Sequence, residues 1–582
     1  MFVLRCCQRA RVAHLLSMWT PREASTRATS ICHHATHTYS TQALYMPPRP
    51  EENVIYSPLP PLELPEQDAH NIIFSRALKW SNKDAIECGI TGRKYTYGNI
   101  VDQALRWAGV VSRVLAAPSS KRNRLTLFSV NAPEFPILLL GSLAAGATVS
   151  TVSPNYTADE VARQLIDNET DMLVTDPKLE SILIDALTKI KKTIPIFVSG
   201  VSAHGHPNIR HILEDSSKPF AEPVQSPLKS TAVILYSSGT TGKPKGVELS
   251  HGAITSNLHM FTHPYFFPYL PTTQEYQESV IGVMPFYHVY GMHVVNLITL
   301  YLGAKVISLP AFTPQDFVRN IRDHKIRVLH TIPSILNFLC ESPEVTSADL
   351  ESVRVVLCAA APVLPTTTEA FKKKAPNPIL FQEGFGLTET LPSLITPMDD
   401  ERIGWCGKCV PNTEIKIVDL ETGKALPELQ RGELCIRSPS LMTGYLNNPV
   451  ATAETIDQDG FLHTGDVAVH KDGFVSIVDR IKELIKVKGY QVSPSELEDV
   501  LQQHPGVVDC AVVGVDDARS GEVPRAYIIR KDCNTTEEQV HEFMRHKVAK
   551  YKQLKGGIVF VDTLPRSSIG KILKKELKAI AP

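Results

Sequence analysis

A glycine- and hydroxyl-rich loop at residues 236–246, with the sequence YSSGTTGKPKG, carries the strongest chemical signal in the chain. Its glycines at positions 239, 242 and 246 allow backbone N–H groups to approach an anion, and its hydroxyls add hydrogen bonds. Lys243 and Lys245 offset phosphate charge. The glycine spacing is too short for the GxxxxGK[ST] loop of P-loop proteins. Apolar, strand-like runs on both sides favour a phosphate cradle over a flexible linker.

The elements that must position this loop alternate between strand and helix. Strand-like runs at residues 231–235 and 353–357 and an amphipathic helix at 97–115 are typical of α/β layers. Residues 135–158 carry no charge, and their small polar residues predict a buried helix, a buried strand and a turn instead of a membrane span. We expect an α/β fold with a large N-terminal domain of layered subdomains, residues 46–479, and a small mobile C-terminal α/β domain, residues 480–582.

The C-terminal domain is predicted to begin its first helix at Ser493. This serine is the N-cap, Pro494 occupies the first helical position, and Glu496 stands where it can bond back to the cap. A histidine, a proline and a glycine at 504–506 end the helix. The pattern then predicts a strand at 507–515, a helix at 535–548, a strand at 558–562 and a last helix at 572–580.

Length, charge and cysteine usage exclude several classes of protein. A chain of 582 residues exceeds one hydrophobic core, so at least two domains are expected. A formal net charge of -1 leaves no electrostatic footprint for nucleic acid. The 11 cysteines lack the spacing of a disulfide scaffold and fit a reducing compartment. Cys406 and Cys409 have no second pair to complete a zinc site, and we expect a structural role for them.

The first 45 residues differ in composition from the rest of the chain. They are rich in arginine, serine and threonine, and Glu23 is their one acidic residue. This bias is typical of a mitochondrial transit peptide, and a disordered tail is the alternative. We therefore expect the mitochondrial matrix, with the cytoplasm or the peroxisome as alternatives, although the simplest peroxisomal ending, Ser-Lys-Leu, is absent.

Five further motifs follow the loop in order. They are PFYH at 285–288, GFGLTE at 384–389, HTGD at 463–466, DRIK at 479–482 with its continuation to Gly489, and PRSSIGK at 565–571. With the loop, they resemble the adenylate-forming superfamily, which includes acyl-CoA synthetases, 4-coumarate–CoA ligases, beetle luciferases and peptide-synthetase adenylation domains. The resemblance covers residues 51–579. The segment 482–498 is more similar to 4-coumarate–CoA ligases and luciferases than to acetyl-CoA synthetases.

The resemblance implies an ATP site. Phe385 would lie against adenine, Thr388 would contact phosphate, and Glu389 would hold Mg²⁺, a cation that prefers carboxylate oxygen. Asp466 and Arg480 would contact the ribose. The full set of implied ATP-binding residues is Ser237, Ser238, Gly239, Thr240, Thr241, Gly242, Lys245, Gly384, Phe385, Gly386, Thr388, Asp466 and Arg480.

Two residues depart from the commoner Gln-Gly-Tyr-Gly form of the family. Glu383 replaces the glutamine and Phe385 replaces the tyrosine. Stacking on the nucleotide survives, but a hydroxyl contact is lost. The glutamate is expected to add a negative charge near the nucleotide.

The resemblance also implies three catalytic residues. Lys571 would stabilise the charge that builds when a carboxylate attacks the α-phosphate, and the alternative is an ordinary lysine of a basic helix. His288 would gate the acyl pocket, and Lys486 would assist thioester formation. A hinge would lie at Lys482. The implied CoA-side residues are Lys488 and Gly489, and the implied acyl-pocket residues are His288, Tyr290, Ala359, Ala360, Leu391 and Pro392.

The function implied by this resemblance is that of an AMP-forming acyl-CoA synthetase. It would activate a medium-chain or aryl carboxylic acid with ATP and Mg²⁺ and form the thioester with coenzyme A, and neither a nucleic acid partner nor a transmembrane span is expected. Oxidation of the adenylate, as in luciferases, and nucleotide binding without catalysis are the alternatives. The presence of Lys571 and Glu389 disfavours the second. The acid, the chain-length limit and the oligomeric state stay open.

Overall fold

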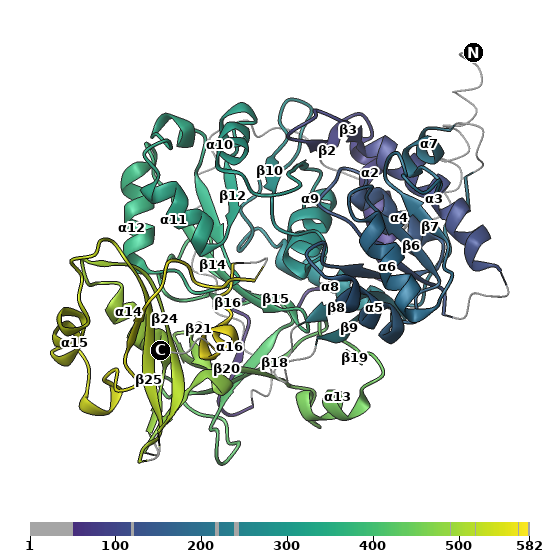
Figure 1. Cartoon of the computed structure of the whole chain (residues 1–582). Helices are drawn as coiled ribbons and strands as arrows, with labels where there is room; N and C mark the ends of the chain where they lie inside the picture. Colours follow the sequence, from purple (N-terminus) through teal and green to yellow (C-terminus); the bar gives the residue numbers. More distant parts are fainter. Residues whose placement is uncertain are drawn as a thin grey trace. The chain divides into compact units, whose positions relative to one another are not determined.

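The structure is a computed structural model that describes residues 51–117, 122–215, 220–237, 244–488, 490–517, 519–567 and 570–579 (Figure 1). Some predictions fall outside these residues. They concern the N-terminal segment 1–45 and the residues Ser238, Gly239, Thr240, Thr241, Gly242 and Gly489.

A seven-stranded sheet carries the two ends of the predicted phosphate loop. Its order is β19-β9-β8-β5-β4-β6-β7. β8 ends at Ser237, β9 begins at Lys245, and these two residues are antiparallel cross-strand partners. The strands are β19 (Gly444–Tyr445), β9 (Lys245–Ser250), β8 (Thr231–Ser237), β5 (Thr148–Val152), β4 (Arg124–Phe128), β6 (Met172–Thr175) and β7 (Ile196–Val198). Both ends of the loop are therefore fixed by sheet pairing.

Two further sheets of the N-terminal region contain parallel strands. One has the order β10-β11-β2-β3 and the other β12-β13-β14-β15-β16. In the second, β12, β13 and β14 are parallel. The strands are β10 (Ser279–Gly282), β11 (Lys305–Ser308), β2 (Asp84–Cys88), β3 (Lys94–Thr96), β12 (Val328–Thr331), β13 (Val355–Cys358), β14 (Leu380–Leu387), β15 (Leu391–Ile395) and β16 (Lys408–Cys409). The carboxyl ends of three parallel strands thus share one edge.

The remaining N-terminal sheet is antiparallel, with the order β1-β17-β18-β20-β21. Its strands are β1 (Val54–Tyr56), β17 (Glu414–Val418), β18 (Gly432–Arg437), β20 (Leu462–Lys471) and β21 (Phe474–Arg480). The C-terminal sheet has the order β23-β22-β25-β24, with β26 beside β25. Its strands are β22 (Ile485–Val487), β23 (Tyr490–Val492), β24 (Val507–Asp517), β25 (Gly521–Arg530) and β26 (Ile558–Phe560).

Helices pack beside these sheets, and Figure 1 shows α3, α4, α5 and α6 gathered at the seven-stranded sheet. The α-helices are α2 (Ala69–Ala77), α3 (Tyr97–Leu115), α4 (Phe135–Ala144), α5 (Ala158–Asp167), α6 (Glu180–Ile190), α7 (Ile209–Glu214), α8 (His251–Phe261), α9 (Ile298–Tyr301), α10 (Pro314–Asp323), α11 (Pro333–Glu341), α12 (Pro365–Lys374), α13 (Pro449–Thr455), α14 (Pro494–Leu501), α15 (Glu537–Arg545) and α16 (Lys574–Lys578). Short helical segments are η1 (Leu78–Trp80), η2 (Tyr290–Leu297, a π-helix), η3 (Ala348–Leu350), η4 (Ile481–Glu483) and η5 (Lys550–Lys552).

The packing of α3 against α4 shows how the uncharged segment is buried. Thr96 caps α3 and accepts a hydrogen bond from the Asn99 amide, and the Asn99 side chain bonds back to the cap. A Cβ on Gly141 would lie 2.4 Å from the Ala104 carbonyl oxygen, so only glycine permits this approach of the two helices. α4 is buried along its whole length. The predicted helices at 97–115 and after 135, and the buried strand that follows, are confirmed.

Among the helices of the described residues, none combines the length and the apolar character that crossing a membrane requires.

The C-terminal domain begins its first helix as predicted, with one difference. Ser493 caps α14 and accepts a hydrogen bond from the Glu496 amide, with Pro494 at the first helical position. The prediction that Glu496 bonds back to the cap is wrong, because its carboxylate pairs with Lys552. The last helix is shorter than predicted and covers only Lys574–Lys578.

Candidate active site

One group of the predicted nucleotide residues lies at the carboxyl end of β14. Gly384, Phe385 and Gly386 lie in β14, which ends at Leu387, and Thr388 and Glu389 follow. Ligands of α/β sheets bind at such carboxyl ends. A Cβ on Gly386 would lie 2.6 Å from the Leu391 carbonyl oxygen, so glycine is required where β14 pairs closely with β15 beside their shift in register.

Glu389 is held by two hydroxyl groups from distant parts of the chain. The Ser237 hydroxyl donates to Glu389 Oε1 at 2.8 Å, and the Tyr445 hydroxyl donates to the same oxygen at 3.0 Å. Among the described residues, no hydrogen bond reaches Oε2. The Lys245 Nζ atom lies 4.7 Å from the centre of the Tyr445 ring. The first end of the phosphate loop therefore bonds to the carboxylate that the resemblance assigns to Mg²⁺, and the second end lies over the ring of the tyrosine that bonds to it.

Asp466 and Arg480 are cross-strand partners on β20 and β21. The Arg480 Nε atom lies 3.0 Å from Asp466 Oδ1, and the aspartate side chain is 4% exposed. Asp466 Oδ2 is buried without a hydrogen-bond partner in the described structure. Burial raises the pKa of Asp466, while Arg480 and Lys571 oppose that rise. A buried acceptor without a partner is costly, so this oxygen suits a ligand hydroxyl.

Lys571 is presented by a tight turn of the C-terminal domain. Arg566 and Ile572 form an antiparallel bridge, and the Ser567 amide donates to the Lys571 carbonyl at 2.7 Å. The side chain reaches solvent, yet loss of hydration lowers the pKa of the ammonium. Arg480 lowers this pKa further, whereas Asp466, Glu483 and Glu389 raise it. The lysine charge therefore acts on the two carboxylates of the predicted nucleotide site.

Glu383 differs from its predicted state. Burial raises the pKa of its carboxyl to about 7, although backbone amides of Gly404 and Val363 donate to it and lower that pKa. The Gly404 amide lies 2.6 Å from Glu383 Oε1. Burial thus opposes the expected extra negative charge at this position. The buried glutamate partly imitates the neutral glutamine of the commoner motif.

His288 lies between β10 and the π-helix η2, and Tyr290 is the first residue of η2. Burial lowers the pKa of His288 to about 4, with a smaller effect from Lys571, so the imidazole is uncharged at neutral pH. The Tyr290 hydroxyl donates to the Thr331 carbonyl at 3.5 Å, and its ring packs edge-on against His330 at 6.2 Å. Asn131 fixes the preceding loop by accepting from the Phe286 amide at 2.7 Å. Aromatic groups therefore surround the end of β12.

The other predicted acyl-pocket residues lie at the ends of β13 and β15. Ala359 and Ala360 follow β13, and Leu391 and Pro392 begin β15. Ala360 has a φ of 75° and Leu391 a φ of 55°, both in the left-handed region that residues with a Cβ adopt rarely. Such strained residues cluster at functional sites. This geometry was not foreseen from the sequence.

The predicted hinge and CoA-side residues lie in and just after η4 and β22, at the start of the C-terminal domain. Lys482 belongs to η4, and burial followed by the Arg480 charge lowers its pKa. Lys486 and Lys488 are exposed on β22 and just after it. Their amides bond to Glu522 and Ser520, both residues of the C-terminal domain. The described contacts do not bring Lys486 or Lys488 to Glu389 or Asp466.

Tyr445 is a site residue that the sequence did not indicate. It lies in β19, a strand two residues long whose pairing with β9 brings it to the loop. A tyrosine after a glycine carries no local signal, so only the sheet pairing identifies it. Cys406 and Cys409 are buried in a hydrophobic cluster, as expected for structural cysteines.

Comparison with known proteins agrees with this geometry. The family model described as AMP-binding enzyme matches residues 73–446, and the model described as AMP-binding enzyme C-terminal domain matches residues 496–571. The chain belongs to the AMP-binding enzyme family. It is thus a member of the adenylate-forming superfamily, as the motif order predicted.

Individual relatives of this AMP-binding enzyme cover nearly its whole length. The 4-coumarate–CoA ligase 3 of Arabidopsis thaliana is 35% identical over 547 residues, covering 92% of this chain and 95% of the relative. The probable 4-coumarate–CoA ligase 1 of Dictyostelium discoideum is 32% identical over 544 residues, covering 90% and 97%. ATP-bound MatB from Rhodopseudomonas palustris superimposes with a TM-score of 0.78 at 29% identity, covering 88% of this chain and 99% of that one.

These findings confirm the predicted α/β class with a large N-terminal and a small C-terminal domain. They also show that the chain belongs to the class of ATP-dependent acid–CoA ligases.

The Tyr445→Phe variant tests the role of the tyrosine hydroxyl. It keeps the ring below Lys245 but removes the hydrogen bond to Glu389. A hydrogen bond to a charged group contributes about 1.5 kcal/mol or more, so we expect the KM for ATP to rise roughly tenfold. Steady-state kinetics against ATP measure this, with Tyr445→Leu as the variant that also loses the ring. An unchanged KM in Tyr445→Phe would contradict the role.

The Glu383→Gln variant tests the raised pKa of Glu383 through stability. The unfolded carboxyl ionises near its ordinary pKa of 4.5, whereas the folded one resists ionisation up to about 7. The wild type therefore loses stability as pH rises from about 4.5 through 7, and the glutamine variant does not. We expect the variant's advantage in melting temperature to grow by roughly 3 °C between pH 5 and pH 8. Exposed Glu369→Gln is the control, and an equal difference at both pH values would contradict the prediction.

Proposed function

We propose that the enzyme joins an aryl or medium-chain carboxylic acid to coenzyme A in two steps. In the first, a carboxylate oxygen of the acid attacks the α-phosphorus of ATP, the acyl–phosphate bond forms, and the bond to pyrophosphate breaks. In the second, the thiolate sulfur of coenzyme A attacks the acyl carbonyl carbon. The thioester bond forms there as AMP leaves.

The observation that carries this proposal is the interaction of Lys571 with Glu389 and Asp466. These residues belong to three separate motifs, and the lysine charge acts on both carboxylates. Asp466 Oδ2, buried and without a partner among the described residues, offers an acceptor for a ribose hydroxyl. In this proposal, Lys571 stabilises the negative charge that develops on the α-phosphate.

Glu389 fits the role of a Mg²⁺ ligand. Its Oε1 atom accepts from Ser237 and Tyr445, which fixes the carboxylate while Oε2 remains available to a ligand. Carboxylate oxygens are the ligands that this hard cation prefers. When bound, Mg²⁺ would supply positive charge at the ATP phosphates.

The aryl or medium-chain class is supported by the relatives and by the groups near β12. The relatives named above are 4-coumarate–CoA ligases at 32% and 35% identity. Tyr290 and His330 pack edge-on beside the predicted pocket. His288 is uncharged at neutral pH because its pKa is lowered to about 4. An uncharged ring can lie against an apolar acyl group without the cost of burying a charge.

The test is a substrate panel with the purified full-length chain and MgATP. The panel contains hydroxycinnamates, benzoates, straight-chain acids of increasing length, and acetate as the small control. Pyrophosphate release reports adenylation, and chromatography of the acyl-CoA reports thioester formation, with coenzyme A present or omitted.

We expect thioester that depends on coenzyme A from one aryl or medium-chain class and little from acetate. Adenylate formation without thioester would overturn the transfer to coenzyme A, and oxygen uptake with the adenylate would indicate oxidation instead. Absence of pyrophosphate release across the whole panel would overturn catalysis.

A further inference from the structure

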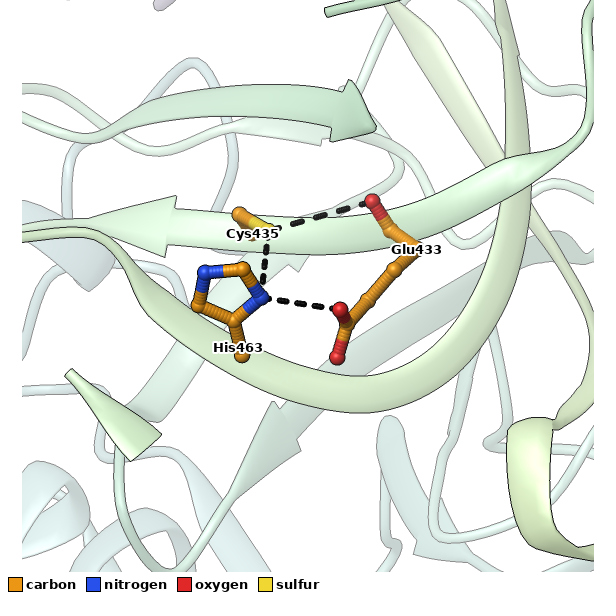
Figure 2. A group of neighbouring side chains, drawn as sticks. All are labelled: Glu433, Cys435 and His463. Atoms are coloured by element: carbon orange, nitrogen blue, oxygen red, sulfur yellow. Dashed lines mark hydrogen bonds and ion pairs between the residues drawn. The ribbon is translucent and has the colours of Figure 1, made fainter. Parts of the chain in front are cut away.

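The carboxylate of Glu433 on β18 contacts the turn 464–466, which carries Asp466, and the histidine before it. The Gly465 amide donates to Glu433 Oε1 at 3.0 Å, and His463 Nδ1 lies 2.8 Å from Glu433 Oε2. Figure 2 shows Glu433 and His463 facing each other across neighbouring strands, with Cys435 beside them. The two carboxylate oxygens of Glu433 therefore contact Gly465, which directly precedes Asp466, and His463, which lies three positions before it.

The strand register explains why a side chain is needed there. Glu433 pairs with Val467, and Cys435 pairs with His463, so the pairing of β18 with β20 shifts between them. Between these two pairs, one residue of β18, Leu434, lies opposite three residues of β20, 464–466. These extra residues of β20 form the turn 464–466, which has no regular backbone partners on β18, although Asp466 pairs with Arg480 of β21 on the other side. The Glu433 carboxylate accepts from the Gly465 amide, and the Leu434 carbonyl accepts from the Thr464 hydroxyl at 2.8 Å.

His463 is also anchored on its far side. Its Nε2 atom lies 3.6 Å from Asp457 Oδ2, and that carboxylate pairs with Lys416 at 3.1 Å. The bond to Glu433 raises the pKa of His463, Asp457 adds to the rise, and burial and Lys416 oppose it. An imidazole between two carboxylates favours its charged form, which strengthens both contacts.

We propose that Glu433 and His463 are positioning residues that fix the turn 464–466 and so aim Asp466 Oδ2 at the ribose of ATP. This inference rests on the proposed nucleotide role of Asp466. The contacts of Asp466 support the proposed positioning. Its Oδ1 atom lies 3.0 Å from Arg480 Nε, and its backbone amide donates to Thr464 Oγ1 at 3.1 Å. With Oδ1 held by Arg480, the direction in which Oδ2 points depends on the backbone of the turn 464–466.

A metal ion is the other use that this cluster suggests. Glu433, Cys435 and His463 offer ligand atoms that lie within 4.8 Å of one another. However, Nδ1 of His463 is already at hydrogen-bonding distance from Glu433. Burial also raises the pKa of the Cys435 thiol, which keeps it protonated, whereas metals bind the thiolate. The contacts therefore favour a hydrogen-bonded network without a metal ion.

The test measures ATP affinity of the full-length enzyme by calorimetry, with the acid and coenzyme A omitted. Glu433→Ala removes both contacts, and Glu433→Gln keeps an acceptor for the Gly465 amide. We expect ATP binding to weaken roughly tenfold in Glu433→Ala and by less in Glu433→Gln. We expect the binding of 2′,3′-dideoxy-ATP to change little, because the lost contact is to the ribose hydroxyls.

A double-mutant cycle links Glu433 to Asp466. Asp466→Asn should weaken ATP binding more than Glu433→Ala does, and the double variant should be little worse than Asp466→Asn alone. His463→Gln should behave like Glu433→Ala. Cys435→Ser and the exposed Glu421→Gln are controls that should leave affinity unchanged.

Three outcomes would overturn the inference. They are an equal loss for ATP and dideoxy-ATP, additive effects of Glu433→Ala and Asp466→Asn, and a loss in Cys435→Ser that matches Glu433→Ala and is restored by Zn²⁺. If Glu433→Ala does not fold, the comparison of Glu433→Gln with Glu433→Asp decides between the same outcomes. Because the assay needs no acid, a failure to find an acid substrate would affect the proposed function and leave this result intact.

Discussion

Replacing Lys571 by alanine is expected to slow adenylation by about 10²- to 10³-fold, the loss that follows removal of one electrostatic stabiliser from an active site. The reason is the position of the ammonium, whose charge acts on Asp466, Glu389 and His288. The second half-reaction, from a supplied acyl-adenylate to the thioester, needs no new charge on the α-phosphate. We expect it to keep nearly the wild-type rate.

The measurement is a pair of single-turnover assays. One follows pyrophosphate release from ATP and the best acid, and the other follows acyl-CoA formation from synthetic acyl-adenylate. Lys575→Ala, an exposed lysine of α16, is the matched control. Equal losses in both assays would show that Lys571 supports the fold or the binding of AMP, and would contradict a role confined to adenylation.

The pH dependence of the first assay carries further information. Loss of hydration and the Arg480 charge lower the pKa of Lys571, and the charged form is the one that stabilises the phosphate. Adenylation by the wild type should therefore fall as pH rises through this lowered pKa. Lys571→Ala should lose this alkaline limb while keeping its low residual rate.

The sequence predicted those parts of the site whose signal is local. The resemblance carried by the motifs implied Glu389, Asp466 and Lys571 as site residues, and α3 and α4 followed from apolar patterning and capping. A local pattern states which residues matter but gives no pairing. That Asp466 and Arg480 face each other across β20 and β21 required the structure.

The missed parts depend on contacts between segments that are far apart in the chain. Tyr445 reaches Glu389 only because the two-residue strand β19 adds to the edge of β9. Glu433 acts on a turn some thirty residues later, through a shift in register that no pattern in β18 announces. The left-handed backbone at Ala360 and Leu391 is set by the packing of strand ends. The protonation of Glu383 depends on its burial in the folded chain, which raises the pKa of its carboxyl and is not visible in the sequence.

Glu389→Gln is expected to lower the adenylation rate by roughly 10²-fold at ordinary Mg²⁺ concentrations and to raise the Mg²⁺ concentration needed for half-maximal rate. Glutamine keeps the size of the side chain and an oxygen that accepts from Ser237 and Tyr445. It removes the negative charge that a hard cation requires. The measurement is a Mg²⁺ titration of pyrophosphate release at fixed ATP.

The interpretation of Glu389→Gln depends on comparison with Tyr445→Phe, which keeps the carboxylate charge. If the carboxylate holds the cation, Glu389→Gln should shift the Mg²⁺ dependence strongly, while Tyr445→Phe shifts it only slightly. If the carboxylate instead serves to anchor the ends of the phosphate loop, the two variants should show similar Mg²⁺ dependence and differ only in the KM for ATP. The second pattern would contradict the assignment of Glu389 to Mg²⁺. Ser237 and Tyr445 both donate to Oε1, and the glutamine oxygen can accept these hydrogen bonds as well. An unchanged Mg²⁺ dependence in Glu389→Gln would therefore show that the negative charge has no effect of its own.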